Sequence, residues 1–373
     1  MKLTIERAAL IRSLGHVQSV VERRTTIPIL SNVKLDAQGG GLSVSATDMD
    51  LSVVERTAAE VQRPGATTAP AHLLYEVVRK LPEGSAIDLE LQDGGGAELT
   101  LVAGRTTFTL PCLPADDFPG MGEDGVDHRF AMPAGQLRRL IDKTRFAIST
   151  EETRYYLNGI YLHATEDGAA SALRGVATDG HRLARIEAPL PDGAEGMPAV
   201  IVPRKTVGEL RKLIHDTDAE VQIGLTNSRI QFTVGEAVLR SRLIDGTFPD
   251  YERVIPKHND KTLVADTKQL SEAVDRVATV STDKTRAVKL GLSSGRLTVS
   301  AISPDAGRAV EELDVAYNAD ALEIGFNARY ILDMTGQIDG AEIELVMADA
   351  ASPTLVRDPK DGGAIYVLMP MRV

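Results

Sequence analysis

Ala86-Ile-Asp-Leu-Glu-Leu, at residues 86–91, is one of three alternating segments that decide the fold. Its counterparts are Glu220-Val-Gln-Ile-Gly-Leu and Glu342-Ile-Glu-Leu-Val-Met. Apolar residues stand at every second position of each segment, which predicts a strand with one buried face. Ile87, Val221 and Ile343 are 134 and 122 residues apart, so similar strands recur at a domain-sized interval.

Two further landmarks recur in the same order. A short strand precedes an amphipathic helix at 7–21, 134–147 and 267–280, where Leu10, Leu137 and Leu270 hold similar places. A strand then runs into a turn at 42–48, 173–179 and 297–303, and a second helix leads to each alternating strand. Three landmarks in one order predict a threefold repeat of about 124 residues, which nearly exhausts the chain.

The predicted fold class is therefore α+β, with three repeated β-rich domains that each carry two helices. The chain has 373 residues, which is long enough for two or three domains. Polar segments with Gly or Pro at 121–128 and 249–261 mark candidate boundaries. We expect the repeats to cover 1–124, 128–252 and 256–373.

Composition excludes several classes of protein. Hydrophobic residues make up 43% and charged residues 25% of the chain, which is typical of a folded globular protein. The single cysteine, Cys112, excludes an internal disulfide framework and a cysteine-based zinc site. No apolar run approaches the roughly 20 residues that span a bilayer. Glu6 and Arg7 stand where a signal peptide would begin its apolar core, so we expect a cytoplasmic protein.

The net charge of −12 is unevenly distributed. The six helix segments together carry +6, so the remainder of the chain carries −18. If the helices share one surface, that surface attracts phosphate while the rest repels it. Lys and Arg are also good helix formers on solvated faces, which would give the same count. Charge alone therefore does not decide whether the helices share a surface that attracts phosphate.

Eight short strings in this order resemble the bacterial DNA sliding clamp, the beta subunit of DNA polymerase III, over essentially the whole chain. They are Thr26-Ile-Pro-Ile-Leu-Ser-Asn-Val, Leu113-Pro-Ala-Asp-Asp-Phe-Pro, Arg154-Tyr-Tyr-Leu-Asn-Gly, Ala177-Thr-Asp-Gly-His-Arg-Leu-Ala, Ile201-Val-Pro-Arg-Lys, Phe248-Pro-Asp-Tyr, Gly325-Phe-Asn and the terminal Tyr366-Val-Leu-Met-Pro-Met-Arg-Val. Each string is weak alone, but their common order on a threefold repeat makes the resemblance close.

The resemblance implies a processivity factor without chemistry of its own. Each chain would form half of a closed ring, with its helices on the inner face. Two chains joined head to tail would encircle duplex DNA without reading its sequence. The implied partners are the replicative polymerase alpha subunit, a clamp loader, and other polymerases and repair proteins that bind through short peptide motifs. We expect no cofactor and no membrane partner.

The resemblance also implies three sets of functional residues. A pocket for partner peptides would comprise Leu157, Thr178, Gly180, His181, Arg182, Leu183, Pro249, Arg253, Val254, Asn327, Tyr330, Val367, Leu368, Met369, Pro370, Met371 and Arg372. Family positions that contact DNA correspond to Arg24, Tyr155, Tyr156 and Lys205. Helix position alone adds Arg12, Arg79, Arg138 and Lys143 as DNA-binding candidates.

The third set is the subunit interface. The resemblance pairs Arg105, Phe108 and Leu110 of the first repeat with Thr279, Val280, Glu311 and Glu312 of the third. Thr279 stands where a larger apolar residue is common, and Arg308 interrupts a region that is usually more acidic. Either the ring is weaker here, or backbone pairing of edge strands carries the contact.

Two other functional classes remain open. Asp179 and His181 could form an acid–base pair in a hydrolase, although neither a Gly-x-Ser-x-Gly motif nor a nucleotide-binding loop accompanies them. The chain could also be a peptide-binding adaptor without a DNA role. Asp48 and Asp50 resemble metal ligands, but no third ligand is evident, so we expect no metal site.

Overall fold

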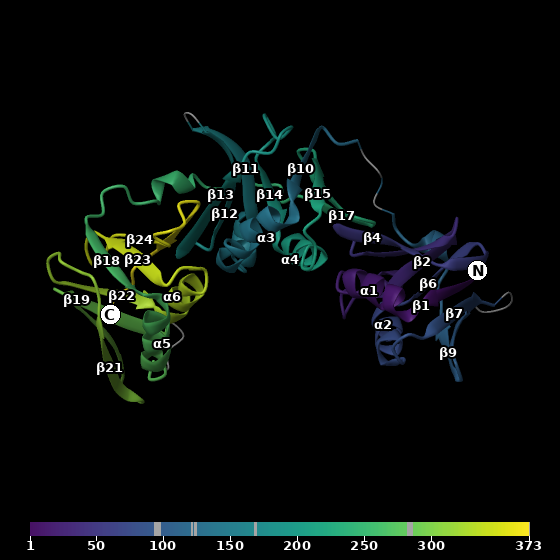
Figure 1. The fold of residues 1–373 in the computed structure, drawn as a ribbon, viewed down its shortest axis with the longest axis horizontal. Coiled ribbons are helices and arrows are strands. Elements are labelled where there is room, and N and C mark those ends of the chain that lie inside the picture. Colours follow the sequence, from purple (N-terminus) through teal and green to yellow (C-terminus); the bar gives the residue numbers. More distant parts are fainter. Residues whose placement is uncertain (93–97, 121, 123–124, 168–169, 282–285, 373) are drawn as a thin grey trace. The chain divides into compact units, whose positions relative to one another are not determined.

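A strand that leads directly into a helix, followed by further strands, is the unit from which this chain is built (Figure 1). The computed structural model describes residues 1–373 except 93–97, 121, 123–124, 168–169, 282–285 and 373. Within these residues the unit occurs six times, so each expected repeat contains two copies. Of the candidate boundary at 121–128, Met121, Glu123 and Asp124 lie outside the described residues.

Among the described residues, six helices form. The three predicted at 7–21, 134–147 and 267–280 end earlier, at 17, 142 and 278. A residue that disfavours helix follows two of the others, because Pro82 stands after Leu81 and Gly336 ends the last helix. The helices are α1 (Arg7–Val17), α2 (Ala71–Lys80), α3 (Ala134–Asp142), α4 (Arg204–Leu213), α5 (Thr267–Ala278) and α6 (Ala328–Thr335). None of them is both long enough and apolar enough to cross a bilayer, within the part of the chain that the structure describes.

The structure divides into two compact units, which we describe separately. The first comprises Met1–Arg138, Pro191–Pro198 and Lys205–Leu243, and the second comprises Arg139–Leu190, Ala199–Arg204 and Ile244–Val373. Residues of the second expected repeat therefore contribute to both units.

The first unit contains a five-stranded and an eight-stranded antiparallel sheet. In spatial order, the five-stranded sheet holds β5 (Glu60–Arg63), β1 (Lys2–Glu6), β7 (Ala86–Leu91), β8 (Glu98–Ala103) and β9 (Thr106–Pro111). The eight-stranded sheet holds β10 (His128–Pro133), β15 (Glu220–Leu225), β16 (Arg229–Val234), β17 (Ala237–Arg242), β4 (Leu51–Ala58), β3 (Gly41–Thr47), β2 (Asn32–Gln38) and β6 (Gly65–Pro70). Helices α1 and α2 lie side by side (Figure 1), and α1 packs on β3 and β4.

The second unit contains an eight-stranded and a four-stranded antiparallel sheet. The eight-stranded sheet holds β14 (Val200–Pro203), β11 (Gly159–Asp167), β12 (Ala170–Thr178), β13 (Arg182–Pro189), β25 (Ala364–Leu368), β24 (Thr354–Arg357), β23 (Glu342–Met347) and β18 (Lys261–Asp266). The four-stranded sheet holds β21 (Gly307–Asp314), β20 (Arg296–Ser303), β19 (Ala287–Ser293) and β22 (Leu322–Asn327). Helices α5 and α6 lie side by side, and α5 also packs on β20 and β21 (Figure 1).

The three alternating segments prove to be equivalent strands. They form β7, β15 and β23 with the predicted bounds, and Ile87, Val221 and Ile343 are buried. Their partners across the ladder also correspond, because Ile87 faces Ile5, Val221 faces Met132 and Ile343 faces Ala265. Leu10, Leu137 and Leu270 are buried as well. The threefold repeat is confirmed by register as well as by element order.

The two halves of each repeat exchange their leading strands. In the first repeat β1 pairs with β7 of the second half, while β6 pairs with β2 of the first half. The same exchange joins β10 to β15 and β14 to β11, and then β18 to β23 and β22 to β19. Each half therefore supplies backbone hydrogen bonds to a strand of the other half.

Gly159 gives a test of this packing. A Cβ added there would lie 2.3 Å from the carbonyl oxygen of Val202, whereas a Cβ at Gly208 on α4 would meet nothing within 4 Å. We expect Gly159→Ala to lower the free energy of unfolding by about 1–3 kcal/mol, because backbone must move. Gly208→Ala should raise it by about 1 kcal/mol through helix propensity. Denaturant unfolding followed by circular dichroism checks both, and equal effects would contradict this register.

Candidate functional site

A cavity of about 300 Å³ opens on the eight-stranded sheet of the second unit. Its walls come from the 3-10 helix η4 (Glu152–Leu157), the turn between β12 and β13, the segment around the 3-10 helix η5 (Tyr251–Arg253), and β25 with the residue after it. We call it the Tyr251 cavity. It is lined by Arg154, Tyr156, Leu157, Thr178, Gly180, Arg182, Leu183, Pro249, Tyr251, Val254, Val367 and Met369.

The apolar base of the Tyr251 cavity is part of the core. Leu157, Leu183 and Val367 belong to one cluster of buried residues that also includes Phe248 and Tyr251. Phe248 stacks on Tyr161 with ring centroids 4.7 Å apart and planes 2° apart. The cavity is therefore an apolar recess in well-packed surroundings, which suits aliphatic or aromatic anchors of a ligand.

The turn between β12 and β13 shapes one wall. Gly180 has φ +87°, a value that favours glycine, and a Cβ there would lie 2.5 Å from Nη1 of Arg154. The Thr178 hydroxyl accepts from the Gly180 N–H and donates to the Arg182 carbonyl. The string Thr178-Asp-Gly-His thus specifies a rigid turn by local hydrogen bonds.

Arg182 is a buried brace rather than a free cation. Its Nε donates to Asp179 at 3.1 Å, Nη1 donates to Asp333, and Nη2 donates to the Phe146 carbonyl at 2.6 Å. The guanidinium also lies 4.4 Å from the ring centroid of Tyr330. Asp179 is consequently committed to Arg182 and to backbone N–H groups, which leaves no acid–base pair with His181.

Tyr251 is held from beneath by a polar network. Nδ1 of His163 lies 3.0 Å from the Ala164 carbonyl oxygen, which can only accept, so Nε2 accepts from the Tyr251 hydroxyl at 2.9 Å. Burial raises the pKa of the Tyr251 phenol, against a smaller lowering by Arg174, so the group keeps its proton at neutral pH. Nη1 of Arg174 donates to the same hydroxyl at 3.4 Å.

Arg174 connects this network to two carboxylates. It donates to Glu187 at 2.7 Å and to Glu252 at 2.8 Å, and its side chain is only 11% exposed. Burial lowers the pKa of the guanidinium, but the hydrogen bonds to Tyr251 and Glu187 outweigh burial and leave that pKa above its ordinary value. The segment 249–261, expected as a boundary because it is polar, is thus anchored on the sheet through Tyr251 and Glu252.

Nine of the predicted peptide-pocket residues line the Tyr251 cavity, and eight do not. His181 and Tyr330 line a neighbouring polar cavity instead. Asn327 caps α6 by accepting from the Arg329 N–H at 2.9 Å, and Met371 donates its N–H to the Gly325 carbonyl at 2.8 Å. Also outside the lining are Arg253, Leu368, Pro370 and Arg372.

Three residues that line the cavity were absent from the predicted pocket. Arg154 and Tyr156 stand in the string Arg154-Tyr-Tyr-Leu, and Tyr251 ends Phe248-Pro-Asp-Tyr. Both strings stand in the sequence, but the resemblance places Tyr156 among the DNA-contacting positions and gives no role to Arg154 or Tyr251. Its neighbour Tyr155 is 54% exposed, and the two rings meet edge to face with centroids 5.8 Å apart.

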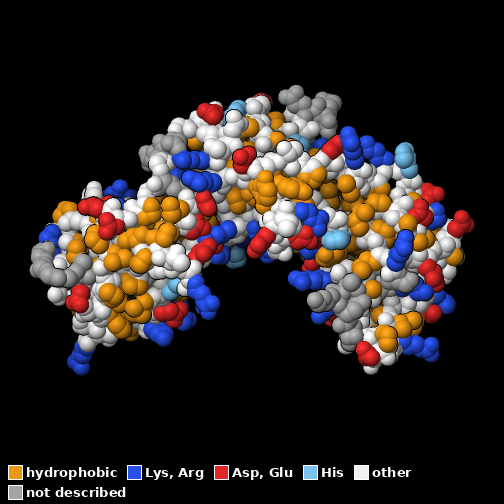
Figure 2. Space-filling view, turned by 180° about the vertical axis from the view of Figure 1, so that it is seen from behind, with side chains coloured by type: hydrophobic (Ala, Val, Ile, Leu, Met, Phe, Trp, Pro, Cys, Tyr) orange, Lys and Arg blue, Asp and Glu red, His pale blue; other side chains and the backbone are white. Residues whose placement is uncertain are grey.

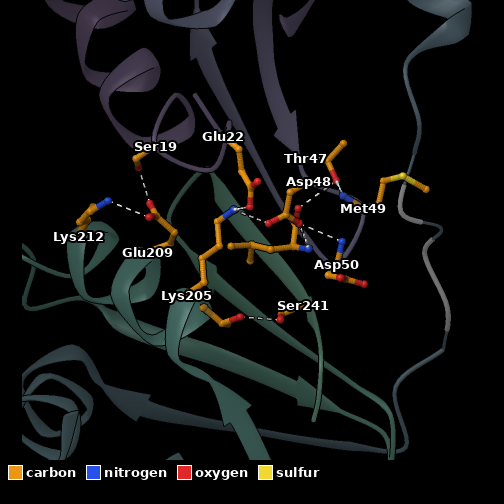
Figure 3. A network of polar contacts seen from close by, with 12 residues as sticks. Ser19, Glu22, Thr47, Asp48, Met49, Asp50, Lys205, Glu209, Lys212 and Ser241 are labelled. Atoms are coloured by element: carbon orange, nitrogen blue, oxygen red, sulfur yellow. Dashed lines mark hydrogen bonds and ion pairs between the residues drawn. The ribbon is translucent and has the colours of Figure 1, made fainter. Parts of the chain in front are cut away.

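Lys205, a predicted DNA contact, is paired with carboxylates in the first unit (Figure 3). Its Nζ lies 2.5 Å from Oδ2 of Asp48 and 3.3 Å from Oε1 of Glu22. Burial lowers the pKa of the ammonium group, but these two carboxylates outweigh burial and raise it. Asp48 also accepts from the Asp50 and Leu51 N–H groups, so it braces a turn. Among the residues that the structure describes, no group of three His, Cys, Asp or Glu side chains could hold a metal ion.

The other DNA-binding candidates differ in availability. Arg138 donates to the Ile214 and His215 carbonyls at 2.8 and 2.7 Å, which caps the end of α4. Lys143 has a side chain 8% exposed and donates to Gln337 and Asp339. Arg79 pairs with Glu76 on the surface, whereas Arg12 and Arg24 are exposed. On the face that Figure 2 draws, Lys and Arg side chains are interspersed with Asp and Glu.

The predicted interface residues lie at or near two edge strands. β9 is an edge of the five-stranded sheet and β21 an edge of the four-stranded sheet. Arg105 and Glu312 are exposed, Phe108, Val280 and Glu311 are partly exposed, and Leu110 is buried in its own core. Glu311 forms an ion pair with Arg276 at 2.7 Å, and Thr279 ends α5 as its cap.

Comparison with known proteins gives one consistent family. Models of the DNA polymerase III beta subunit match three times: the N-terminal domain at 1–122, the central domain at 131–250 and the C-terminal domain at 252–372. The beta sliding clamp of Caulobacter vibrioides is 56% identical over 373 residues and covers both chains completely.

Two solved structures agree over the full chain. A DnaN sliding clamp from Bartonella birtlesii bound to griselimycin has a TM-score of 0.97 at 48% identity and covers both chains completely. The beta sliding clamp of Caulobacter crescentus has a TM-score of 0.97 at 55% identity and covers all of this chain and 99% of that one.

The buried network beneath the Tyr251 cavity can be tested by stability. We expect Arg174→Met to lower the free energy of unfolding by about 3 kcal/mol, because two partly buried carboxylates lose their main partner. Arg357→Met removes a similar cross-strand pair with Glu344, but the Arg357 side chain is 47% exposed, and the loss should stay below about 1 kcal/mol. Urea unfolding measures both, and comparable losses would show that the Arg174 network stabilises nothing beyond a surface pair.

Proposed function

The chain belongs to the family of DNA polymerase III beta subunits, the beta sliding clamps, and from that premise we propose how its residues form a ring and recruit partners. As a member of this family it is a DNA sliding clamp that tethers a polymerase to its template, and it is not an enzyme. We propose that two copies join head to tail around duplex DNA. We infer a cytoplasmic location, because a clamp that acts on chromosomal DNA must be in the same compartment as that DNA.

The two edge strands carry the ring proposal. β9 and β21 each leave one row of backbone N–H and C=O groups without a neighbouring strand in their sheets, and an unprotected edge is a template for another chain. Val310 on β21 and Ile302 on the adjacent β20 are 61% and 79% exposed, which is unusual for large apolar side chains. Arg105 next to β9 and Glu312 on β21 have opposite charges. We therefore propose that β9 of one copy pairs with β21 of the next.

We assign the Tyr251 cavity to short peptide segments of partner proteins, such as the polymerase alpha subunit and the clamp loader. Its apolar base is formed by Leu157, Leu183 and Val367, while Met369 adds an adaptable side chain at the rim. Griselimycin, which the Bartonella clamp binds, is a suitable probe because it is peptide-like. The binding residues proposed are those of the cavity lining, with Arg182 as a brace.

Two exposed valines test the interface and the cavity against each other. Val310→Glu should convert the dimer to a monomer at micromolar concentration, because a charge replaces an apolar contact at the proposed interface. Val254→Glu, at a position 40% exposed in the wild type, should weaken griselimycin binding at least about tenfold. The oligomeric state of both variants is measured by sedimentation, and their griselimycin affinity is measured by titration calorimetry.

Each variant is the control for the other, since both replace an exposed valine by glutamate. Val310→Glu should keep its griselimycin affinity, and Val254→Glu should stay dimeric. A dimeric Val310→Glu protein would refute the β9–β21 assignment, and unchanged griselimycin affinity in Val254→Glu would refute the cavity assignment.

We propose that Arg24 and Lys205, with the exposed Arg12, contact DNA phosphates without reading sequence. We do not propose a glutamate at position 205, because it would stand beside Glu22 and Asp48 and disrupt the network in Figure 3. Glutamine at 205 removes the charge without adding a third carboxylate.

A comparison of retention on circular and on linear DNA tests the DNA role. A wild-type clamp placed on nicked circular DNA by a loader should be retained, and it should be lost when the circle is cut. The double variant Arg24→Glu, Lys205→Gln should load roughly tenfold less well while remaining dimeric, because nonspecific binding depends on phosphate contacts. Equal retention on circular and linear DNA would refute a topological clamp, whereas normal loading of the variant would refute only these two contacts.

A further inference from the structure

A second cavity, of about 400 Å³, lies beside the Tyr251 cavity and shares Arg182 with it. We call it the arginine cavity, because Arg145, Arg182, Arg204 and Arg329 all line it. These side chains come from separate places in the second unit: the 3-10 helix η3 (Arg145–Ala147), β13, the first residue of α4 and the first turn of α6. The resemblance placed His181, Arg182 and Tyr330, which also line it, in the peptide pocket, but it gave no role to Arg145, Arg204 or Arg329.

The carboxylates that line the arginine cavity are already occupied. Asp179 accepts from Nε of Arg182 at 3.1 Å and from two backbone N–H groups. Asp333 accepts from Nη1 of the same guanidinium. Glu151 accepts from Nε of Arg154 at 2.8 Å. The four arginines and three carboxylates of the lining leave a formal charge of +1, and none of these carboxylates forms an ion pair with Arg204 or Arg329 in the described part of the chain.

Arg204 and Arg329 retain their hydrogen-bond donors. Both side chains are exposed, and neither forms an ion pair with any residue in the described part of the chain. Arg145 pairs only with Asp142, at 3.3 Å, among those residues. Guanidinium groups donate and never accept, so the groups still available in this cavity include the donors of arginines that come from different elements. Such a set suits a ligand made of acceptors, which means an oxyanion.

The positions of the two free arginines argue against a purely structural role. Arg204 is the first residue of α4 and Arg329 the second residue of α6, and neither helix has an acidic residue in its first turn. Cations at a helix N-terminus are repelled by the helix dipole, so stability alone disfavours them there. A bound anion would reverse the sign of that interaction.

We propose that the arginine cavity binds a phosphoryl group, held between Arg204 and Arg329. The fork of a guanidinium matches two oxygens of a phosphate, and two forks match a diphosphate better than a single carboxylate. Free pyrophosphate and the nucleic-acid backbone both present this chemistry. Only the second source rests on the proposed DNA role, and the free anion tests the site by itself.

Titration calorimetry with sodium pyrophosphate, inorganic phosphate and citrate, at low ionic strength and without divalent cations, tests the site on the full chain. We expect saturable binding of pyrophosphate by the wild type, and at least a tenfold loss in Arg204→Gln and in Arg329→Gln. Arg357→Gln, at an arginine on β24 that is 47% exposed and lies outside the cavity, is the matched control and should bind as the wild type does. Unchanged thermal unfolding and griselimycin affinity in each variant show that the fold and the Tyr251 cavity are intact.

Four outcomes decide the proposal. Absence of saturable binding by the wild type overturns it, as does an equal loss in the Arg357→Gln control. Tighter binding of citrate than of pyrophosphate overturns the phosphoryl assignment. Binding lost specifically in the Arg204→Gln and Arg329→Gln variants supports it.

Retention on nicked circular DNA identifies the source of the anion. If pyrophosphate competes with retention and the two variants load less well, the source is the nucleic-acid backbone. If DNA retention is unaffected, the site serves the free anion. Failure of the clamp to encircle DNA at all would refute the proposed function and leave the pyrophosphate result standing.

Discussion

Backbone hydrogen bonding between β13 and β25 is the contact on which the site depends. This ladder joins the second expected repeat to the end of the chain and places Leu183 opposite Val367, two residues that line the Tyr251 cavity. The next pair, Arg182 and Leu368, brings the brace of the cavity beside the C-terminal strand. A matching ladder between β17 and β4 extends the other eight-stranded sheet. Because main-chain pairing does not require particular side chains, both ladders tolerate extensive divergence of sequence.

Above this ladder the site is fixed by polar contacts rather than by apolar packing alone. His163, Arg174 and Glu187 lie opposite one another on three adjacent strands, so their spacing follows directly from strand register. They hold Tyr251, whose ring faces the cavity while its hydroxyl is fixed beneath. A wall held on both sides is preorganised, which reduces the entropy lost when a peptide binds.

The net charge of the helix segments does not show which of their cations are available to bind DNA. The helix segments carry an excess of positive charge, yet Lys205, Lys143 and Arg138 donate to groups of their own chain. Arg12, Arg24, Arg204 and Arg329 are among the exposed ones. A clamp that slides needs weak, replaceable contacts with phosphate, so individual exposed cations on an acidic protein are physically consistent with its task.

The sequence by itself determined the threefold repeat, the six helices, the bounds of β7, β15 and β23, and nine residues of the Tyr251 cavity. Periodic burial is a local property of the chain, and a family resemblance transfers positions one by one, so both are legible without coordinates. Only the tertiary structure decided that Tyr251 and Tyr156 enter the cavity, that the two halves of each repeat exchange strands, and that Asp48 neutralises Lys205 across 157 positions of sequence. Such partners meet because sheets bring distant segments together, and neither periodicity nor composition encodes which side chains will then lie within a few ångströms of each other.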